Sequence, residues 1–183
     1  MGAVLTYERS AADRLTRRDL AALPDDGRRY ELVDGLLLVS AAPSPLHQRA
    51  VLRLARLLDD ACPAELEVFP APLAVALADD TELQPDVVVA RRADLTDVEL
   101  PAAPVLAVEV LSPSTRRADL GVKLRRLEQV GTAAYWAFDP RAVRLRAWVL
   151  RDGAFDLDAD VLGDEPYETA VPFPVTVVPA SLV

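Results

Sequence analysis

The sequence predicts one α+β domain, in which helices flank a β-sheet that mixes parallel and antiparallel strands. Three observations predict it. Of the 183 residues, 51% are hydrophobic and 27% are charged, which is an ordinary globular composition. Short Val- and Leu-rich runs alternate with two helical patterns. No internal repeat and no linker divides the chain, so residues 1–183 are expected to form a single domain.

The first elements are a helix and a hairpin. Residues 15–23 (LTRRDLAAL) predict a short helix, with Thr16 at its start. Residues 30–40 predict a β-hairpin, because Asp34 and Gly35 stand between two apolar runs and Gly accepts the positive φ that a tight turn requires.

The clearest helix is predicted over residues 45–61. Ser44 is a candidate cap, and Pro45 suits the first helical turn. The apolar residues with i, i+3, i+4, i+7 spacing are Val51, Leu54, Ala55 and Leu58. His47 lies at the N-terminal end of this apolar stripe.

Strands and one further helix follow. The predicted strands are residues 66–69, 73–77, 86–90, 105–111, 134–138 and 143–150. The second helix is predicted over residues 117–130, ending at Gly131. The acidic tail beyond Arg151 is expected to add one edge strand or an ordered loop.

Residue counts exclude several kinds of site. One cysteine, Cys62, excludes a disulfide framework and a multi-cysteine zinc site, and one histidine excludes an HExxH metalloprotease. No Gly-rich phosphate loop and no G-x-S-x-G motif is present. Any metal chemistry must therefore use carboxylates and carbonyls, which suit Mg²⁺, Mn²⁺ or Ca²⁺.

Location and charge give two further expectations. No apolar run approaches the ~20 residues that cross a bilayer, and the N-terminus has no signal-peptide pattern, so no membrane association and a cytoplasmic location are expected. The net charge of −9 argues against a protein that coats nucleic acid. It leaves open an enzyme with a local basic groove.

Two carboxylates interrupt apolar strands. Asp86 begins one strand and Glu109 lies near the end of the next, although desolvating a carboxylate costs several kcal/mol unless it is paired. Residues 91–104 are too few for a strand–helix–strand crossover, which makes the two strands antiparallel neighbours. Both acids then reach the same end of the sheet, where a divalent cation between them would offset the cost of burial.

Lys123 is the only lysine in the chain, against nineteen arginines. On the second predicted helix it aligns with Leu127 and Val130, a stripe that should face the sheet. A compact ammonium approaches a phosphate or a water more closely than a guanidinium does. The alternative interpretation is a solvent-exposed lysine with no special role.

Asp after Pro, Glu on the following strand and a nearby Lys together resemble the PD-(D/E)XK nuclease superfamily, and the match is closer to its Uma-type branch of restriction-endonuclease-like bacterial proteins. The segments that carry the resemblance are RYELVDGLLLVSAAPSPLHQ (29–48), QPDVVV (84–89), AVEVLSPSTRRADLGVKL (107–124) and YWAFDP (135–140). The motif-bearing core covers about residues 28–150.

The resemblance implies a restriction-endonuclease-like fold, a mixed central β-sheet flanked by helices, with a Mg²⁺ or Mn²⁺ site. Asp86 and Glu109 would be metal ligands, with the Val110 carbonyl as a further oxygen. Lys123 would be the catalytic lysine. Glu31 would complete the metal shell, or alternatively pair with an arginine such as Arg28 or Arg29.

The remaining positions of the resemblance are a pocket pair and two departures. His47 and Gln48 match an HQ pair of the branch and would line the pocket, although a hydrogen-bonded core histidine is an equal alternative. Leu111 stands where the superfamily pattern has its lysine, and Leu127 stands where such proteins usually have Tyr.

The function these residues predict is metal-dependent hydrolysis of phosphodiester bonds in nucleic acid, with DNA as the expected substrate of an endonuclease. Because many endonucleases dimerise to cut two strands, a homodimer is one expectation. Two alternatives stay open. The first is a catalytically inactive nuclease fold that serves as a binding or regulatory module, and the second is a hydrolase of small phosphate esters.

Overall fold

The computed structural model describes residues 14–183, so the first thirteen residues of the predicted domain lie outside the described part of the chain. The helices are α1 (Arg17–Leu20), α2 (Pro45–Ala61), α3 (Arg116–Ala118) and α4 (Leu124–Gln129), with a π-helical turn (Asp119–Lys123) between the last two. The strands are β1 (Arg29–Val33), β2 (Leu36–Ser40), β3 (Leu66–Pro70), β4 (Val75–Ala78), β5 (Thr81–Leu83), β6 (Val87–Arg91), β7 (Leu106–Val110), β8 (Ala134–Asp139), β9 (Arg144–Arg151), β10 (Ala154–Leu162), β11 (Tyr167–Thr169) and β12 (Val175–Val177).

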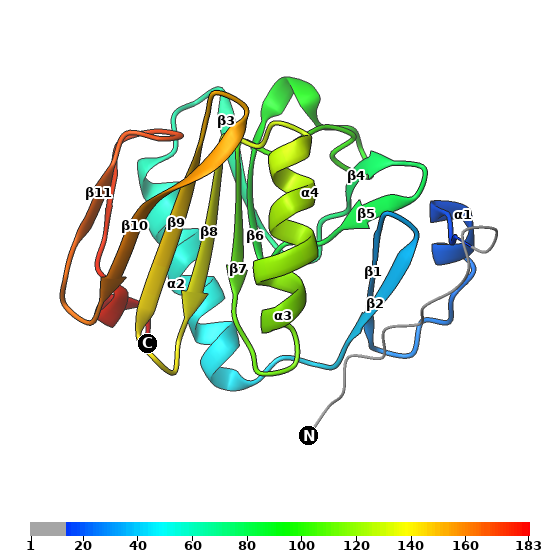
Figure 1. The fold of residues 1–183 in the computed structure, drawn as a ribbon, viewed down its shortest axis with the longest axis horizontal. Coiled ribbons are helices and arrows are strands. Elements are labelled where there is room, and N and C mark those ends of the chain that lie inside the picture. The colour runs from blue at the N-terminus through cyan, green and yellow to red at the C-terminus, as the bar shows by residue number, and fades with distance from the viewer. Residues whose placement is uncertain (1–13) are drawn as a thin grey trace.

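A six-stranded sheet with the order β10-β9-β8-β7-β6-β3 forms the centre of the molecule, and a four-stranded sheet, β2-β1-β5-β4, lies beside it (Figure 1). In the large sheet β7 and β8 are parallel, whereas the other neighbours are antiparallel. Helix α2 covers one face, and α3 with α4 covers the other (Figure 1). The predicted α+β class with a mixed, helix-flanked sheet is therefore confirmed.

The local signals of the first half hold in the structure. Asp34 and Gly35 connect β1 and β2 with φ values of 49° and 78°, the left-handed region that the predicted turn requires. Helix α2 has the predicted bounds, and the Ser44 hydroxyl caps it by accepting a hydrogen bond from the His47 backbone N–H at 3.3 Å. The predicted apolar stripe of this helix is buried against the large sheet.

The central strands position the acidic residues. Val87 on β6 faces Val108 on the antiparallel strand β7, which places Asp86 beside Glu109 at one end of the sheet, as predicted. All residues of β7 and all but the last of β6 are buried, so these carboxylates cannot reach bulk water along the strands. Every charge here needs a partner within the protein or a bound ligand.

The structure corrects the predicted tail, which forms three strands instead of one. The longest, β10, pairs antiparallel with β9 and forms one edge of the large sheet. Two of its acids form cross-strand ion pairs, Asp158 with Arg151 and Asp160 with Arg144. Composition alone does not reveal such pairs, because the partners lie on another strand.

Three smaller differences concern element bounds. The first helix is shorter than predicted, and a capping box between Thr16 and Asp19 stabilises its N-terminus. Strand β5 was not predicted. The second predicted helix, 117–130, is interrupted by the π-helical turn. Within residues 14–183, no helix is long and apolar enough to cross a membrane.

Leu54→Ala is expected to lower the free energy of unfolding by about 3 kcal/mol, since Leu54 on α2 is fully buried and truncation leaves a cavity. The matched control is Leu52→Ala on the same helix, where the side chain is 69% exposed, and the change should stay within about 0.5 kcal/mol. Urea denaturation measures both. Equal losses in the two variants would contradict the assigned face of α2.

Candidate active site

Three structural units deliver charged side chains to one end of the large sheet. Strand β1 carries Arg29 and Glu31, and the β6–β7 pair carries Asp86 and Glu109. The π-helical turn contributes two more charges. The buried charged residues of the described chain are Glu31, Asp86, Glu109, Asp119 and Lys123, each at most 2% exposed.

Lys123 lies at the centre of three carboxylates. Its Nζ atom is 2.8 Å from Glu31 Oε2, 3.0 Å from Glu109 Oε1 and 3.4 Å from Asp119 Oδ1. The second Glu31 oxygen, Oε1, accepts a hydrogen bond from the Gln84 backbone N–H at 2.9 Å. We call these four residues, Glu31, Glu109, Asp119 and Lys123, the lysine cluster.

The π-helical turn sets the direction of the Lys123 side chain. Such turns are rare, and they are frequent at functional sites. Here the turn buries Asp119 and Lys123 together, four residues apart. The Tyr135 hydroxyl donates a hydrogen bond to the Asp119 backbone oxygen at 2.8 Å, which fixes the turn on the sheet. Tyr135 itself is fully buried.

Asp86 has a separate set of donors. Its Oδ1 atom is 2.8 Å from Arg29 Nη1, and its Oδ2 atom is 3.1 Å from His47 Nε2 and 2.8 Å from the Val110 backbone nitrogen, which donates a hydrogen bond. Burial alone would raise the pKa of Asp86. The hydrogen bond from His47 and the positive charge of Arg29 outweigh burial and hold that pKa well below its ordinary value.

Burial acts in the opposite direction on the lysine cluster. Desolvation raises the pKa of Glu109, Lys123 opposes the shift, and the nearby carboxylates reinforce it. Burial likewise raises the pKa of Asp119. Burial would lower the pKa of Lys123, but Glu109, Glu31 and Asp119 reverse that effect and keep the ammonium charged.

The charges in this region do not balance. Arg29 also lies 3.8 Å from Glu31, between Nε and Oε2, so it joins the two groups of charges. Together they contain four carboxylates, those of Glu31, Asp86, Glu109 and Asp119, against the two cations of Arg29 and Lys123. Bound protons or a bound cation must supply the missing positive charge.

The donor chemistry fits a hard divalent cation, because all four acids offer oxygen atoms. Both carboxylate oxygens of Asp119 are buried without a hydrogen-bond partner, which is consistent with unused ligand capacity. However, in residues 14–183 no three side chains of His, Cys, Asp or Glu converge as a metal cage. Asp86 and Glu109 lie at the same end of the sheet as predicted, but Asp86 pairs with the Arg29 guanidinium, whereas Glu109 pairs with the Lys123 ammonium.

A cavity of about 460 Å³ opens onto Asp86. Arg29, His47 and Gln48 line it together with Asp86, so the predicted pocket pair faces this cavity. Further polar lining residues are Arg28, Ser40, Ser44, Gln84, Ser112, Ser114, Thr115 and Arg141. No member of the lysine cluster lines it. Glu31, Asp119 and Lys123 line a separate hollow of about 10 Å³, which shares Ser40 and Thr115 with the cavity.

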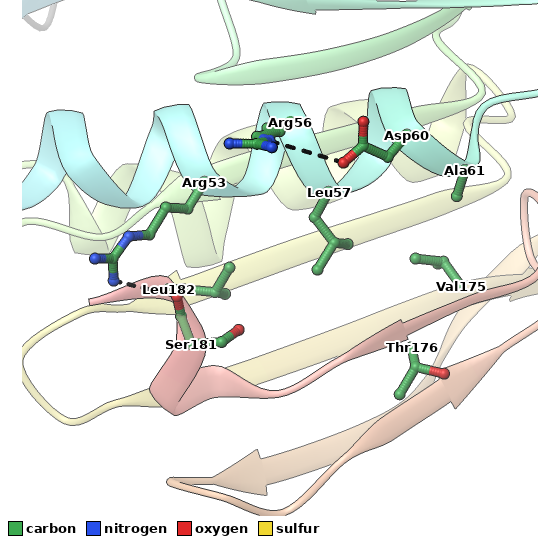
Figure 2. Close-up of a pocket in the computed structure, with 9 residues that line it drawn as sticks. All are labelled: Arg53, Arg56, Leu57, Asp60, Ala61, Val175, Thr176, Ser181 and Leu182. Atoms are coloured by element: carbon green, nitrogen blue, oxygen red, sulfur yellow. Dashed lines mark hydrogen bonds and ion pairs between the residues drawn. The ribbon is translucent and has the colours of Figure 1, made fainter.

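A second hollow, of about 450 Å³, lies between α2 and the C-terminal segment, as Figure 2 shows. It contains none of the residues predicted for the site. Its charged groups are exposed and already engaged: Arg56 pairs with Asp60 at 3.8 Å, and Arg53 donates to the Ser181 and Val183 carbonyl oxygens. The cavity at Asp86 is therefore the candidate active site.

Two residues of the site, Asp119 and Arg29, have contacts that the sequence did not predict. Asp119 was not predicted, although its position four residues before Lys123 was a usable signal. Arg29 was considered only as a partner of Glu31, whereas it also binds Asp86. For Val110 the structure shows a contact of the N–H group, and the role of its carbonyl stays a prediction.

Lys123→Met is expected to destabilise the metal-free protein by about 3–5 kcal/mol at pH 8, because it leaves buried carboxylates unpaired. The loss should shrink towards pH 5. The folded-state pKa values of Glu109 and Asp119 are raised, so as the pH falls the folded variant binds more protons than the unfolded chain, and protonation removes the unpaired charge.

Urea midpoints measured with EDTA at both pH values check this prediction. The matched control is Arg125→Met, an exposed cation on α4, for which the midpoint should change little at either pH. A loss for Lys123→Met that is equal at pH 5 and pH 8 would show that the carboxylates do not titrate as described.

Comparison with known proteins places the chain. A family model, Uma2, described as "Putative restriction endonuclease", matches residues 17–172. A crystal structure of a "putative nuclease" from Anabaena variabilis is similar in fold, with a TM-score of 0.71 and 18% identity over 92% of this chain and 97% of that one. The search of curated proteins gives no match. Because the family model matches residues 17–172, which is most of the chain, this protein belongs to the Uma2 family.

Proposed function

We propose that this protein is a metal-dependent nuclease that hydrolyses phosphodiester bonds, with DNA as its substrate. One observation carries the proposal: two buried carboxylates, Asp86 and Glu109, lie at the same end of neighbouring strands, and the only lysine of the chain contacts Glu109 at 3.0 Å. The family description and the solved structure of similar fold support the same activity.

In this proposal, Asp86 and Glu109 would hold Mg²⁺ or Mn²⁺, with Glu31 and the Val110 carbonyl as further oxygen ligands. When bound, such a cation would supply the Lewis-acid chemistry that phosphodiester hydrolysis needs. Its two positive charges would offset the excess of carboxylates over fixed cations in the site. Because of the same excess of negative charge, burying these four carboxylates without a bound cation or bound protons would cost stability.

In this proposal, Arg29 and Lys123 would interact with the substrate or the attacking water. Arg29 lines the cavity and is 22% exposed, so its guanidinium is available to bind a phosphate oxygen. Lys123 approaches Glu109 from the π-helical turn. When a cation takes over part of the negative charge of Glu109, the ammonium can orient the attacking water or stabilise the transition state. Removing a donor of this kind typically costs about 10²–10³ in rate.

One observation favours a second candidate function, a nuclease fold kept as a binding or regulatory module without catalysis. Arg29 and Lys123 already pair with the four carboxylates, so the cluster is partly neutralised without a metal. A module of this kind needs no divalent cation. Metal binding therefore separates the two candidates.

Asp86→Asn, a nearly isosteric change, is expected to abolish Mn²⁺ binding measured by calorimetry and to reduce Mn²⁺-dependent cleavage of DNA by at least about 10²-fold. The reason is the loss of one ligand charge at the position where two strands meet. Asp59→Asn, an exposed acid at the far end of α2, is the matched control and should leave both measurements unchanged.

Two results would contradict the nuclease proposal. The first is a natural protein that binds no Mn²⁺, which would favour the binding module. The second is cleavage that persists in Asp86→Asn at the rate of the natural protein, because such activity would come from another site or from a contaminant.

A further inference from the structure

A group of arginines lies beside the candidate active site, although the chain as a whole carries a net charge of −9. Arg116 begins α3, and Arg141 lies in the β8–β9 turn and lines the cavity. Arg144 and Arg146 follow on β9. We call these four residues, Arg116, Arg141, Arg144 and Arg146, the arginine row.

Asp139 holds the first part of the row together. Its Oδ2 atom accepts a hydrogen bond from Arg116, and its Oδ1 atom accepts hydrogen bonds from the backbone N–H groups of Arg141 and Ala142, both at 3.1 Å. On the sheet, Asp139 faces Arg144. The Asp139 carboxylate therefore fixes the turn that carries Arg141. This turn leads from the cavity to β9.

Arg146 continues the row on the same face of β9. Its guanidinium lies 5.6 Å from the centre of the Trp148 ring, and no carboxylate of the described chain forms an ion pair with it. Burial is the first cause that holds the pKa of Arg146 below its ordinary value; Arg116 and Arg144 add to it, and Asp160 and Asp139 oppose it.

The local balance of charge explains why the row needs an anion. Arg116 pairs with Asp139 and Arg144 pairs with Asp160, whereas no ion pair of Arg141 or Arg146 exists within residues 14–183. Four guanidinium groups thus face two carboxylates. A single small anion would satisfy one or two arginines, but a row that runs from the cavity along β9 matches the repeated charges of a polyanion.

The arginines on the other face of the sheet are different. In the hollow of Figure 2, Arg56 has Asp60 as its partner and Arg53 binds carbonyl oxygens at the C-terminal end of the described chain. Both arginines that line this hollow are therefore engaged, whereas Arg141, which lines the cavity at Asp86, has no ion-pair partner in the described chain.

We propose that the arginine row binds the sugar–phosphate backbone of a nucleic-acid strand and guides it into the cavity at Asp86. The proposal rests on the nuclease function proposed above and adds the path of the substrate. Arg141 would contact the phosphate next to the cavity, and Arg146 would contact one further along the strand. Such contacts position a strand without reading its sequence.

The test is the double variant Arg141→Ala/Arg146→Ala, with Arg18→Ala/Arg56→Ala as a control of the same charge change at exposed sites outside the row. Fluorescence anisotropy with EDTA present would measure binding of a labelled oligo-dT strand and of a duplex between low and moderate salt. The row variant should bind at least about 10-fold more weakly at low salt, with a salt slope smaller by about 1–2. The control should match the natural protein.

Three outcomes would overturn the proposal: equal binding by the natural protein and the row variant, equal weakening by the control, or no binding of either probe by the natural protein. Arg141→Ala alone, in an exposed turn, repeats the test without disturbing the contact of Arg146 with Trp148. Cleavage is measured separately. If binding depends on the row arginines but no Asp86-dependent cleavage is found, only the nuclease function is rejected. If cleavage depends on Asp86 but the row variant binds as tightly as the natural protein, only the role of the arginine row is rejected.

Discussion

The burial of one ammonium group among three carboxylates is the interaction on which the rest of the structure depends. Lys123 is 1% exposed, and a lysine in that position is stable only because Glu31, Glu109 and Asp119 surround it. The three acids come from β1, β7 and the π-helical turn. The ion cluster therefore joins the small sheet, the large sheet and the helical segment at one point, and displacement of any of these elements would leave a buried charge without its partner.

Arg29 extends this coupling to the surface. It contacts Glu31 of the lysine cluster and Asp86 at the cavity, and it is the more exposed member of both contacts. Arg29 therefore connects the carboxylate at the cavity with the buried lysine cluster through one guanidinium.

Much of the fold could be predicted because the decisive signals are local. The turn at Asp34–Gly35 and the cap at Ser44 depend on neighbouring residues alone, and the meeting of Asp86 and Glu109 follows from a short connection between two apolar strands. The π-helical turn could not be predicted, since it breaks the 3.6-residue period from which helices are recognised. The acidic strand β10 was missed because its partners lie across the sheet.

Net charge was the strongest argument against a nucleic-acid substrate, and the structure shows why a total is the wrong quantity. Glu31, Glu109 and Asp119 are buried and do not line the cavity, and Asp86 at the cavity pairs with Arg29. Asp158 and Asp160 pair with arginines of β9. What an approaching phosphate meets first is the field at the mouth of the cavity, where Arg141 has no acidic partner in the described chain. At distances beyond about 10 Å, salt screens the remaining acidic surface. An acidic protein can therefore carry positive charge at the mouth of its cavity. In the proposed function, a divalent cation, and not the strand itself, would offset the excess of carboxylates over fixed cations in the buried site.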